Sequence, residues 1–349
     1  MTFCEKTCIF NVFREESIMT KRFRLAAVSL AASFLLTACG GSGTQSAPST
    51  PTVESDGSYT VGICQLVQHV AHDDATQGFM DALNDTLPNQ VTFVSKVASN
   101  DISACSGIVN QFISEEVDLI LANATPALQI ASAATAEIPI LGTSVTEYGA
   151  ALGLEDFTGT VGGNISGTSD LAPLDAQAAM IAEWFPEAET IGLLYCSAEA
   201  NSEYQVNVVA AELEAMGYTC KDFAFTDSND LTLVLQGATE ICDAIYVPTD
   251  NTVASNGSTI DNVCRPAGIP VIGGDQGICE SCTVATLCIS YYDLGYATGE
   301  MAAQILSGDA SISEMPIQYA EASSIYNANI CADLGLTPPS DAYQAVNAG

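Results

Sequence analysis

The sequence has very few basic residues. Of its 349 residues only 8 are Lys or Arg, against 42 Asp or Glu, so the formal net charge is −34. Binding of nucleic acid requires clustered Lys and Arg to neutralise phosphates, and this composition excludes a nucleic-acid partner. The same charge disfavours electrostatic attachment to a membrane surface.

Catalytic patterns are also scarce. His69 and His72 are the only histidines and lie in one loop, and no G-x-S-x-G pattern is present. The glycine-rich stretch 162–168 lacks the lysine of a phosphate-binding P-loop and the spacing G-x-G-x-x-G. We interpret it as a hinge segment. The sequence therefore predicts no enzyme, no catalytic residue and no cofactor.

Long apolar runs are missing as well. The N-terminal run 25–36 is too short to span a bilayer and follows Lys21, Arg22 and Arg24, which is typical of a signal peptide. Met19 begins a signal of ordinary length, so residues 1–18 are interpreted as an upstream mis-start.

The signal segment ends in Leu-Thr-Ala-Cys at residues 36–39, which resembles the lipobox of bacterial lipoproteins. The resemblance implies cleavage before Cys39 and lipidation of that residue, so residues 1–39 form the signal peptide. An ordinary signal peptide that happens to contain a Cys is the alternative. Residues 40–58 are rich in Gly, Ser, Thr and Pro and are predicted to form a flexible tether.

Thirteen cysteines are present, and ten remain after the three in residues 1–39 are set aside. An even number in an exported protein favours disulfides, and Cys196 with Cys220 is the pair that we expect. Cys279-x-x-Cys282 with Cys288 suggests zinc as an alternative. No His lies nearby and no second C-x-x-C exists, so no metal site is predicted.

One α/β unit occurs twice in the chain. Residues 243–251, DAIYVPTDN, repeat the pattern of residues 118–126, DLILANATP, in which a buried strand ends in a polar loop before a helix. Residues 269–273 likewise echo 138–142 at a similar offset. The repeat predicts two Rossmann-like lobes, each a parallel sheet flanked by helices, with a ligand cleft between them.

The long helix predicted at 291–307 is expected to return to the first lobe. Lobe 1 then comprises residues 59–166 plus 288–318, and lobe 2 comprises residues 167–287 plus 319–349. Such a chain crosses between lobes three times, which predicts a hinge.

Ligands in open α/β sheets bind beyond the carboxyl ends of the strands. The candidate binding residues at those ends are Gln65, His69, Thr125, Ser144 and Thr146 in the first lobe, and Glu199, Asn201, Ser202, Thr249, Asp250, Asn251 and Asp275 in the second. Several have a local alternative. Thr125 and Asp250 are also typical helix N-caps, and Ser202 begins a capping box.

This predicted ring contains acids, amides and hydroxyls. The basic residues beyond Cys39 are Lys96, Lys221 and Arg265, and none follows a strand. A multiply charged anion would find little to pair with. A zwitterion fits better, with its ammonium at Asp250 or Asp275 and its carboxylate at neutral donors and helix N-termini.

Motifs spread over residues 59–336 resemble one family. They include Gly162-Gly163-Asn164, Asp243–Asn251 and Tyr291-Tyr292-Asp293-Leu294-Gly295, together with Val117–Ala122. The chain resembles the substrate-binding lipoproteins of ABC transporters of the tryptophan/tyrosine type, which have the type I periplasmic-binding-protein fold. Val70 stands where the family usually has Pro.

The resemblance implies an extracytoplasmic protein, lipid-anchored to the cell membrane. It implies binding of an aromatic or other apolar amino acid and delivery of that ligand to a permease powered by an ATPase. A ligand-sensing lipoprotein of the same fold that acts through a signalling partner is the alternative function.

Overall fold

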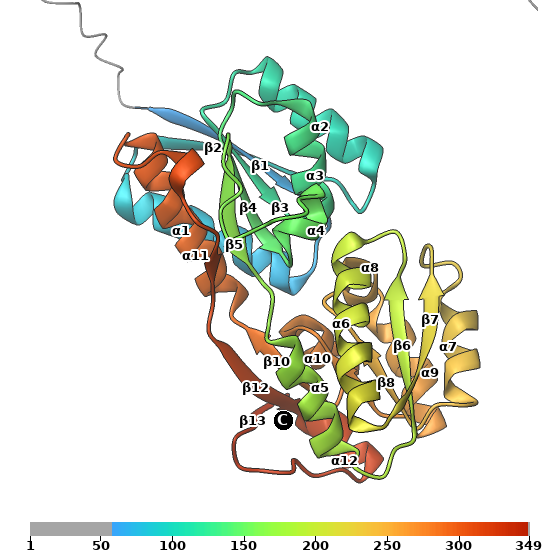
Figure 1. Cartoon of the computed structure of the whole chain (residues 1–349). Coiled ribbons are helices and arrows are strands. Elements are labelled where there is room, and N and C mark those ends of the chain that lie inside the picture. The colour runs from blue at the N-terminus through green and yellow to red at the C-terminus, as the bar shows by residue number, and fades with distance from the viewer. Residues whose placement is uncertain (1–57, 348–349) are drawn as a thin grey trace, which may run out of the picture. The chain divides into compact units, whose positions relative to one another are not determined.

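The computed structural model describes residues 58–347. Within them two sheets are each flanked by helices, which confirms the predicted two-lobe α/β fold (Figure 1). The predicted signal peptide, the predicted lipobox at Cys39 and nearly all of the predicted tether lie outside the described residues. No helix among the described residues is long and apolar enough to cross a bilayer.

The first sheet has six parallel strands in the order β11-β5-β4-β3-β1-β2. Every residue of β3 and β4 is buried, as expected for strands covered on both faces, and this explains the apolar run Leu119–Ala122 in β3. The strands are β1 (Tyr59–Gln65), β2 (Val91–Val97), β3 (Leu119–Asn123), β4 (Ile140–Val145), β5 (Ile165–Ser169) and β11 (Gln318–Tyr319).

The second sheet has seven strands in the order β13-β12-β10-β9-β8-β6-β7, and only the β10–β12 pair is antiparallel. Its strands are β6 (Thr190–Cys196), β7 (Thr219–Phe225), β8 (Ala244–Val247), β9 (Val271–Gly273), β10 (Ala285–Ile289), β12 (Ala322–Asn327) and β13 (Gln344–Val346).

Helices cover both sheets. Lobe 1 contains α1 (Val70–Thr86), α2 (Ile102–Ser114), α3 (Thr125–Ala134), α4 (Tyr148–Leu152), α11 (Tyr291–Leu306) and the short 3-10 helix η1 (Ile312–Glu314). Lobe 2 contains α5 (Leu174–Trp184), α6 (Ala200–Met216), α7 (Leu231–Thr239), α8 (Asn251–Ala254), α9 (Gly257–Ala267), α10 (Gln276–Cys282) and α12 (Ala328–Leu334).

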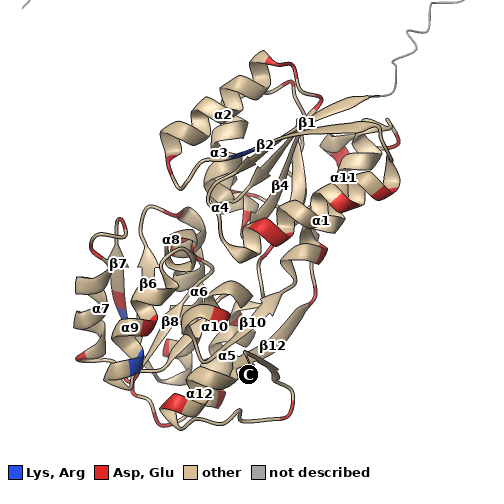
Figure 2. Cartoon of the chain, turned by 180° about the vertical axis from the view of Figure 1, so that it is seen from behind, with Lys and Arg blue, Asp and Glu red and all other residues tan. Residues whose placement is uncertain are grey.

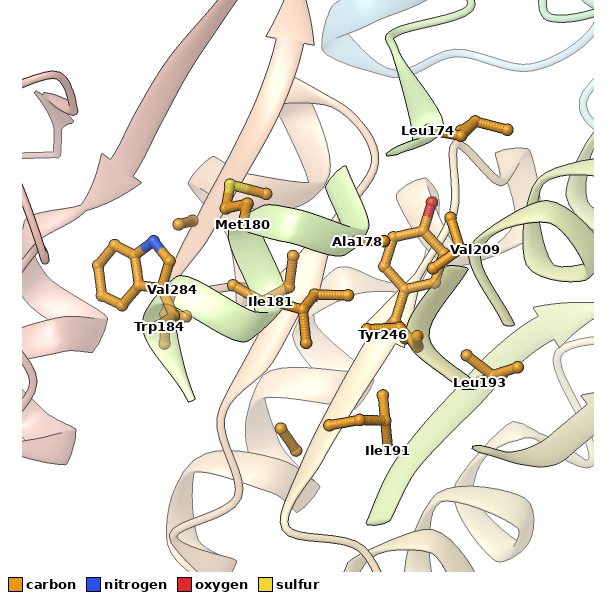
Figure 3. Close-up of a cluster of buried hydrophobic side chains, with 14 of the residues drawn as sticks. Leu174, Ala178, Met180, Ile181, Trp184, Ile191, Leu193, Val209, Tyr246 and Val284 are labelled. Atoms are coloured by element: carbon orange, nitrogen blue, oxygen red, sulfur yellow. The ribbon is translucent and has the colours of Figure 1, made fainter. Parts of the chain in front are cut away.

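The core of lobe 2 packs α5 against the sheet (Figure 3). Ala178 and Ile181 of α5 belong to one buried cluster with the strand residues Ile191 and Leu193. Tyr246 is fully buried, and its hydroxyl donates to Gln177 Oε1 at 2.6 Å, so the one polar atom of its side chain has a partner.

The glycine-rich stretch 162–168 is not the hinge that we expected, because most of it belongs to β5. Gly167 has φ of 146° and lies against β4, where a Cβ atom would come within 2.1 Å of the Gly142 carbonyl oxygen. Glycine here permits close strand packing rather than hinge motion. The chain crosses from β5 to α5 at residues 170–173.

Two further crossings follow, at Ser290 between β10 and α11, and at residues 320–321 between β11 and β12. Helix α11 packs closely along α1 in lobe 1 (Figure 1). Gly295 makes this possible, because a Cβ atom there would lie 1.9 Å from the Ala75 carbonyl oxygen.

The expected disulfides are absent, and all ten cysteines of the described residues are free thiols. The Cys196–Cys220 pairing is wrong because of strand register. Cys220 lies beside Ile191, whereas Cys196 is at the far end of β6, beside Phe225. At about 3.3 Å per residue the two cysteines are roughly 16 Å apart along the strands, too far for a bond.

Candidate functional site

A small buried polar cavity lies between the carboxyl ends of the two sheets, with a volume of about 10 Å³. Eight predicted binding residues line it: His69, Ser144, Thr146, Asn201, Thr249, Asp250, Asn251 and Asp275. They lie at or just beyond the ends of five different strands, so the strand-end argument brings together residues far apart in sequence.

Strained backbone supports the lobe 1 side of the site. Ser144 has φ of 53° within β4, and Ala124 has φ of 106° directly before α3, although neither residue is glycine. Such conformations are costly and cluster at functional sites, where the surrounding structure holds them. Ser144 Oγ and the neighbouring Thr125 Oγ1 are buried and have no hydrogen-bond partner in the protein.

His69 and His72 line the cavity from the lobe 1 side. Their ring centroids are 3.9 Å apart, and His72 Nδ1 lies 3.1 Å from the Val67 carbonyl oxygen. Burial lowers the pKa of His69 to about 4, although the Asp73 charge opposes the shift, and burial also lowers the pKa of His72. Both rings are therefore neutral at physiological pH.

Asp250 and Asp275 cap helices on the lobe 2 side. Asp250 Oδ1 accepts from Val253 N at 2.8 Å and Oδ2 accepts from Cys196 N at 2.7 Å. Asp275 Oδ1 accepts from Ile278 N at 2.8 Å. Burial, followed by the Glu199 charge, raises the pKa of Asp250 to about 8, and burial raises the pKa of Asp275 to about 7.

Glu199 was predicted as a binding residue, but it lies outside the cavity lining and positions α8. Its two oxygens accept from Asn251 N and Nδ2 at 3.0 and 2.6 Å, and from Thr252 N and Oγ1 at 3.0 and 2.8 Å. With Asn201 Nδ2 at 3.4 Å, five donors converge on one buried carboxylate, which fixes the start of the helix that presents Asn251 to the cavity.

Gln65, Thr125 and Ser202 also lie outside the lining. Gln65 is occupied by loop contacts, since Nε2 donates to Val67 O and Asp73 Oδ1, and Oε1 accepts from Thr76. The capping assignments for Thr125 and Ser202 are wrong. Helix α3 already begins at Thr125, and α6 begins at Ala200, two residues before Ser202.

Four lining residues were not predicted: His72, Asp170, Ala254 and Tyr291. Asp170 directly follows β5, and Tyr291 comes one residue after the crossing at the end of β10. The strand-end argument would have found Asp170 if residues 165–169 had been interpreted as a strand. His72 lies three residues after His69, the N-cap of α1, and so about one helical turn away. Helical spacing places both side chains on one side of the chain, and this spacing could have predicted His72 as a lining residue.

No basic side chain lines the cavity. Arg265, on α9, is paired at the surface with Asp261 at 2.6 Å and with Asp333 at 2.8 Å. Figure 2 shows acidic residues on both lobes and few basic ones. No group of three His, Cys, Asp or Glu side chains within residues 58–347 is arranged to hold a metal ion. The zinc alternative at Cys279 and Cys282 therefore gains no support.

Two lobes that enclose a small polar cavity, with unpartnered buried polar atoms facing it, define a solute-binding protein. Comparison with known proteins agrees. Residues 60–344 match the family described as ABC transporter substrate binding protein, and this chain belongs to that family. The family consists of binding proteins rather than enzymes.

Three relatives of known sequence or structure are similar to this chain over most of its length. The chain is 32% identical to the tyrosine-binding protein of Clostridioides difficile over 287 residues, which are 81% of this chain and 83% of the relative. It is 31% identical to an ABC domain from Streptococcus pneumonia solved in complex with L-Trp, with a TM-score of 0.79 over 83% of this chain and 100% of the other.

A third relative is a substrate-binding protein with adhesive properties from Clostridium difficile, solved in a ligand-free, open structure. It is 34% identical, with a TM-score of 0.64 over 82% of this chain and 99% of the other. The TM-score is thus higher for the L-Trp complex, although its sequence identity is slightly lower. ABC transporter solute-binding proteins solved with bound myo-inositol or allitol share the fold at lower identity, 15% and 13%.

Proposed function

We propose that this chain binds a small zwitterionic amino acid, with an aromatic or apolar side chain favoured, and delivers it to an ABC permease and its ATPase. Family membership supports the transport role. The relatives named for tyrosine or solved with tryptophan support an amino-acid ligand and favour an aromatic one.

The observation that carries the proposal is the polarity of the cavity. Carboxyl groups line it together with neutral hydroxyls and amides, and no cation balances them. The ligand's ammonium is proposed to meet Asp250 or Asp275. Its carboxylate is proposed to face neutral donors, of which the unpartnered Ser144 hydroxyl lies in the lining. The Thr125 and Ser202 hydroxyls predicted for this role lie outside the lining, and Asn201 Nδ2 already donates to Thr249 O at 3.0 Å. A dicarboxylate or phosphate would find no Lys or Arg in the lining to pair with.

Calorimetry against the twenty amino acids tests the ligand class, and one matched pair of variants tests the site. Asp275→Asn keeps an oxygen that can cap α10 but removes the charge. We expect it to weaken binding by roughly 100-fold or more, since a buried charge loses its partner. Asp101→Asn changes another helix-capping Asp, at an exposed position outside the cavity lining, and should have no effect.

Two further variants test the predicted polarity from the other side. Lys221→Ala and Arg265→Ala remove two of the three basic side chains within residues 58–347, and neither residue lines the cavity. Both variants should bind normally. Loss of binding in Arg265→Ala would show that the ligand carboxylate is held by a cation, and the proposed orientation would be wrong.

Hinge closure is the second part of the proposal. The two lobes are proposed to rotate around the ligand at the three crossings, which lie at 170–173, 290 and 320–321 rather than at the predicted boundaries after 166, 287 and 318. The higher TM-score against the L-Trp complex than against the open, ligand-free relative supports this. Small-angle scattering should show a smaller radius of gyration after saturation with ligand, and unchanged profiles would argue against rotation.

The third part is a lipid anchor at Cys39 on the outer side of the cell membrane. The lipobox-like residues 36–39 and the short apolar run before them support it. Cys39→Ala should move the protein from the membrane fraction to the soluble fraction. A variant that still sediments with membranes would refute the lipid anchor, and the proposed ligand binding would be unaffected by that result.

A further inference from the structure

Asp170 is a buried carboxyl group that forms part of the cavity lining. It directly follows β5, where the chain leaves lobe 1, and only 3% of its surface is exposed. Its Oδ2 atom accepts from the Tyr291 hydroxyl at 2.9 Å. Its Oδ1 atom is buried and has no hydrogen-bond partner in the protein.

The three cavity acids differ in how far the protein itself satisfies them. Both oxygens of Asp250 already accept backbone N–H groups, and one oxygen of Asp275 does so. Asp170 is the one acid in the lining with a fully buried, unpartnered oxygen. Leaving such an atom unpaired is costly, and burial accordingly raises the pKa of Asp170. A ligand that supplies a charged donor there stabilises the ionised form and gains most.

The surroundings of Asp170 hold it in place before any ligand arrives. The preceding residue, Ser169, is the last of β5. Its hydroxyl donates to Thr146 O at 2.6 Å and accepts from Leu171 N at 3.1 Å. Thr168 Oγ1 lies 2.8 Å from Thr298 Oγ1 of α11. A carboxylate oriented in this way does not need to be ordered on binding, which favours affinity.

Tyr291 connects Asp170 to the second crossing. It is the first residue of α11 and is buried, and its hydroxyl contacts the aspartate that lies on the first crossing. Burial and the Asp170 charge raise the pKa of this phenol, so it stays protonated and acts as a donor. Tyr291 is therefore a positioning residue that fixes which oxygen of Asp170 faces the cavity.

Asp170 and Asp275 are close enough to influence each other electrostatically, and the Asp170 charge contributes to the raised pKa of Asp275. We infer that Asp170, through its free Oδ1, binds the ligand's ammonium together with Asp275 and makes the site select amines over their deaminated analogues. This inference rests on the proposed amino-acid function and names the residue that enforces it. A ligand without the amine would leave Asp170 buried and unpaired.

The test compares L-tyrosine and L-tryptophan with 3-(4-hydroxyphenyl)propionate and 3-indolepropionate, which lack the amine. Calorimetry is performed on the wild type, Asp170→Asn, Tyr291→Phe and the control Asp101→Asn. The wild type should prefer the amine by roughly 30-fold or more, because the analogues leave a buried charge unpaired. Asp170→Asn should lose most of that preference by binding the amino acids less tightly, with little change for the analogues.

Tyr291→Phe should lower the preference partly, by about tenfold at most, since one hydrogen bond that orients Asp170 is lost. Asp101→Asn should match the wild type. Circular dichroism and thermal unfolding confirm that each variant folds, and the ratio of the two affinities does not change with a uniform loss of active protein.

The possible results distinguish the role of Asp170 from the proposed binding of an amino acid. If the wild type binds amino acids and Asp170→Asn keeps the full preference, the role of Asp170 is refuted while the proposed function stands. A wild type that binds neither the amino acids nor tyramine and tryptamine would refute both. Binding of the amines alone would refute the zwitterion while supporting the ammonium site.

Discussion

Ligand binding should become tighter as pH rises from 5.5 to 8. Burial raises the pKa of Asp275 to about 7 in the protein without ligand, so the carboxyl group is mostly protonated at pH 5.5. The ligand's ammonium pairs with the ionised form. Binding must therefore displace a proton at low pH, and it need not do so at pH 8.

The size of the effect follows from the ionised fraction. With a pKa of about 7, roughly 3% of the Asp275 side chains are ionised at pH 5.5 and roughly 90% at pH 8, so the apparent affinity should rise about 30-fold. Asp250, with a pKa of about 8, would extend the rise to higher pH. The cavity histidines do not oppose this trend, because burial holds the pKa of His69 near 4 and lowers that of His72.

Calorimetry with L-tyrosine in buffers of different ionisation enthalpy measures both the affinity and the number of protons released. At pH 6.5 we expect release of between about half a proton and one proton. In Asp275→Asn the pH dependence should become shallower. Affinity that is constant over this range, or that falls as pH rises, would refute the reasoning about the acids.

Three further predictions concern the fold. Glu199→Ala should lower the free energy of unfolding in urea by roughly 3 kcal/mol, because buried donors lose their acceptor, whereas Glu203→Ala on the same helix should cost less than about 0.5 kcal/mol. Gly295→Ala should lower the free energy of unfolding by about 1–3 kcal/mol or more, because it forces α11 away from Ala75. A Cβ atom at Gly107 would meet no atom within 4 Å, so Gly107→Ala should raise the free energy of unfolding by about 0.5–1 kcal/mol. Thiol titration of the unfolded, unreduced protein should find all ten cysteines of the described residues free, and a count of two or fewer would restore the disulfides.

The repeated strand pattern was enough to predict the fold. The central strands β3 and β8 are buried along their whole length, so each appears in the sequence as an apolar run before polar residues. The same rule located eight cavity residues, because parallel strands bring their carboxyl ends to one edge. Side chains placed by strand ends are predictable in this fold.

The errors have equally specific causes. β5 contains Ser166, Gly167, Thr168 and Ser169, which do not resemble an apolar strand, so its end and Asp170 were missed. Glu199 lies at a strand–helix junction like the true lining residues. Only the three-dimensional structure shows its carboxylate directed at the start of α8 instead of the cavity. The number of cysteines gave no information on how β6 and β7 are aligned. That strand register places Cys196 and Cys220 too far apart for a disulfide bond.

The central claim is that the cavity holds the ammonium of an amino acid against buried acids. Titration of the wild type and Asp275→Asn with L-tyrosine and L-tryptophan at pH 8 tests it most directly. We predict one-to-one binding of at least one of them by the wild type and a loss of roughly 100-fold or more in the variant. Equal affinity in the two proteins, or no binding of any amino acid by the wild type, would contradict the claim.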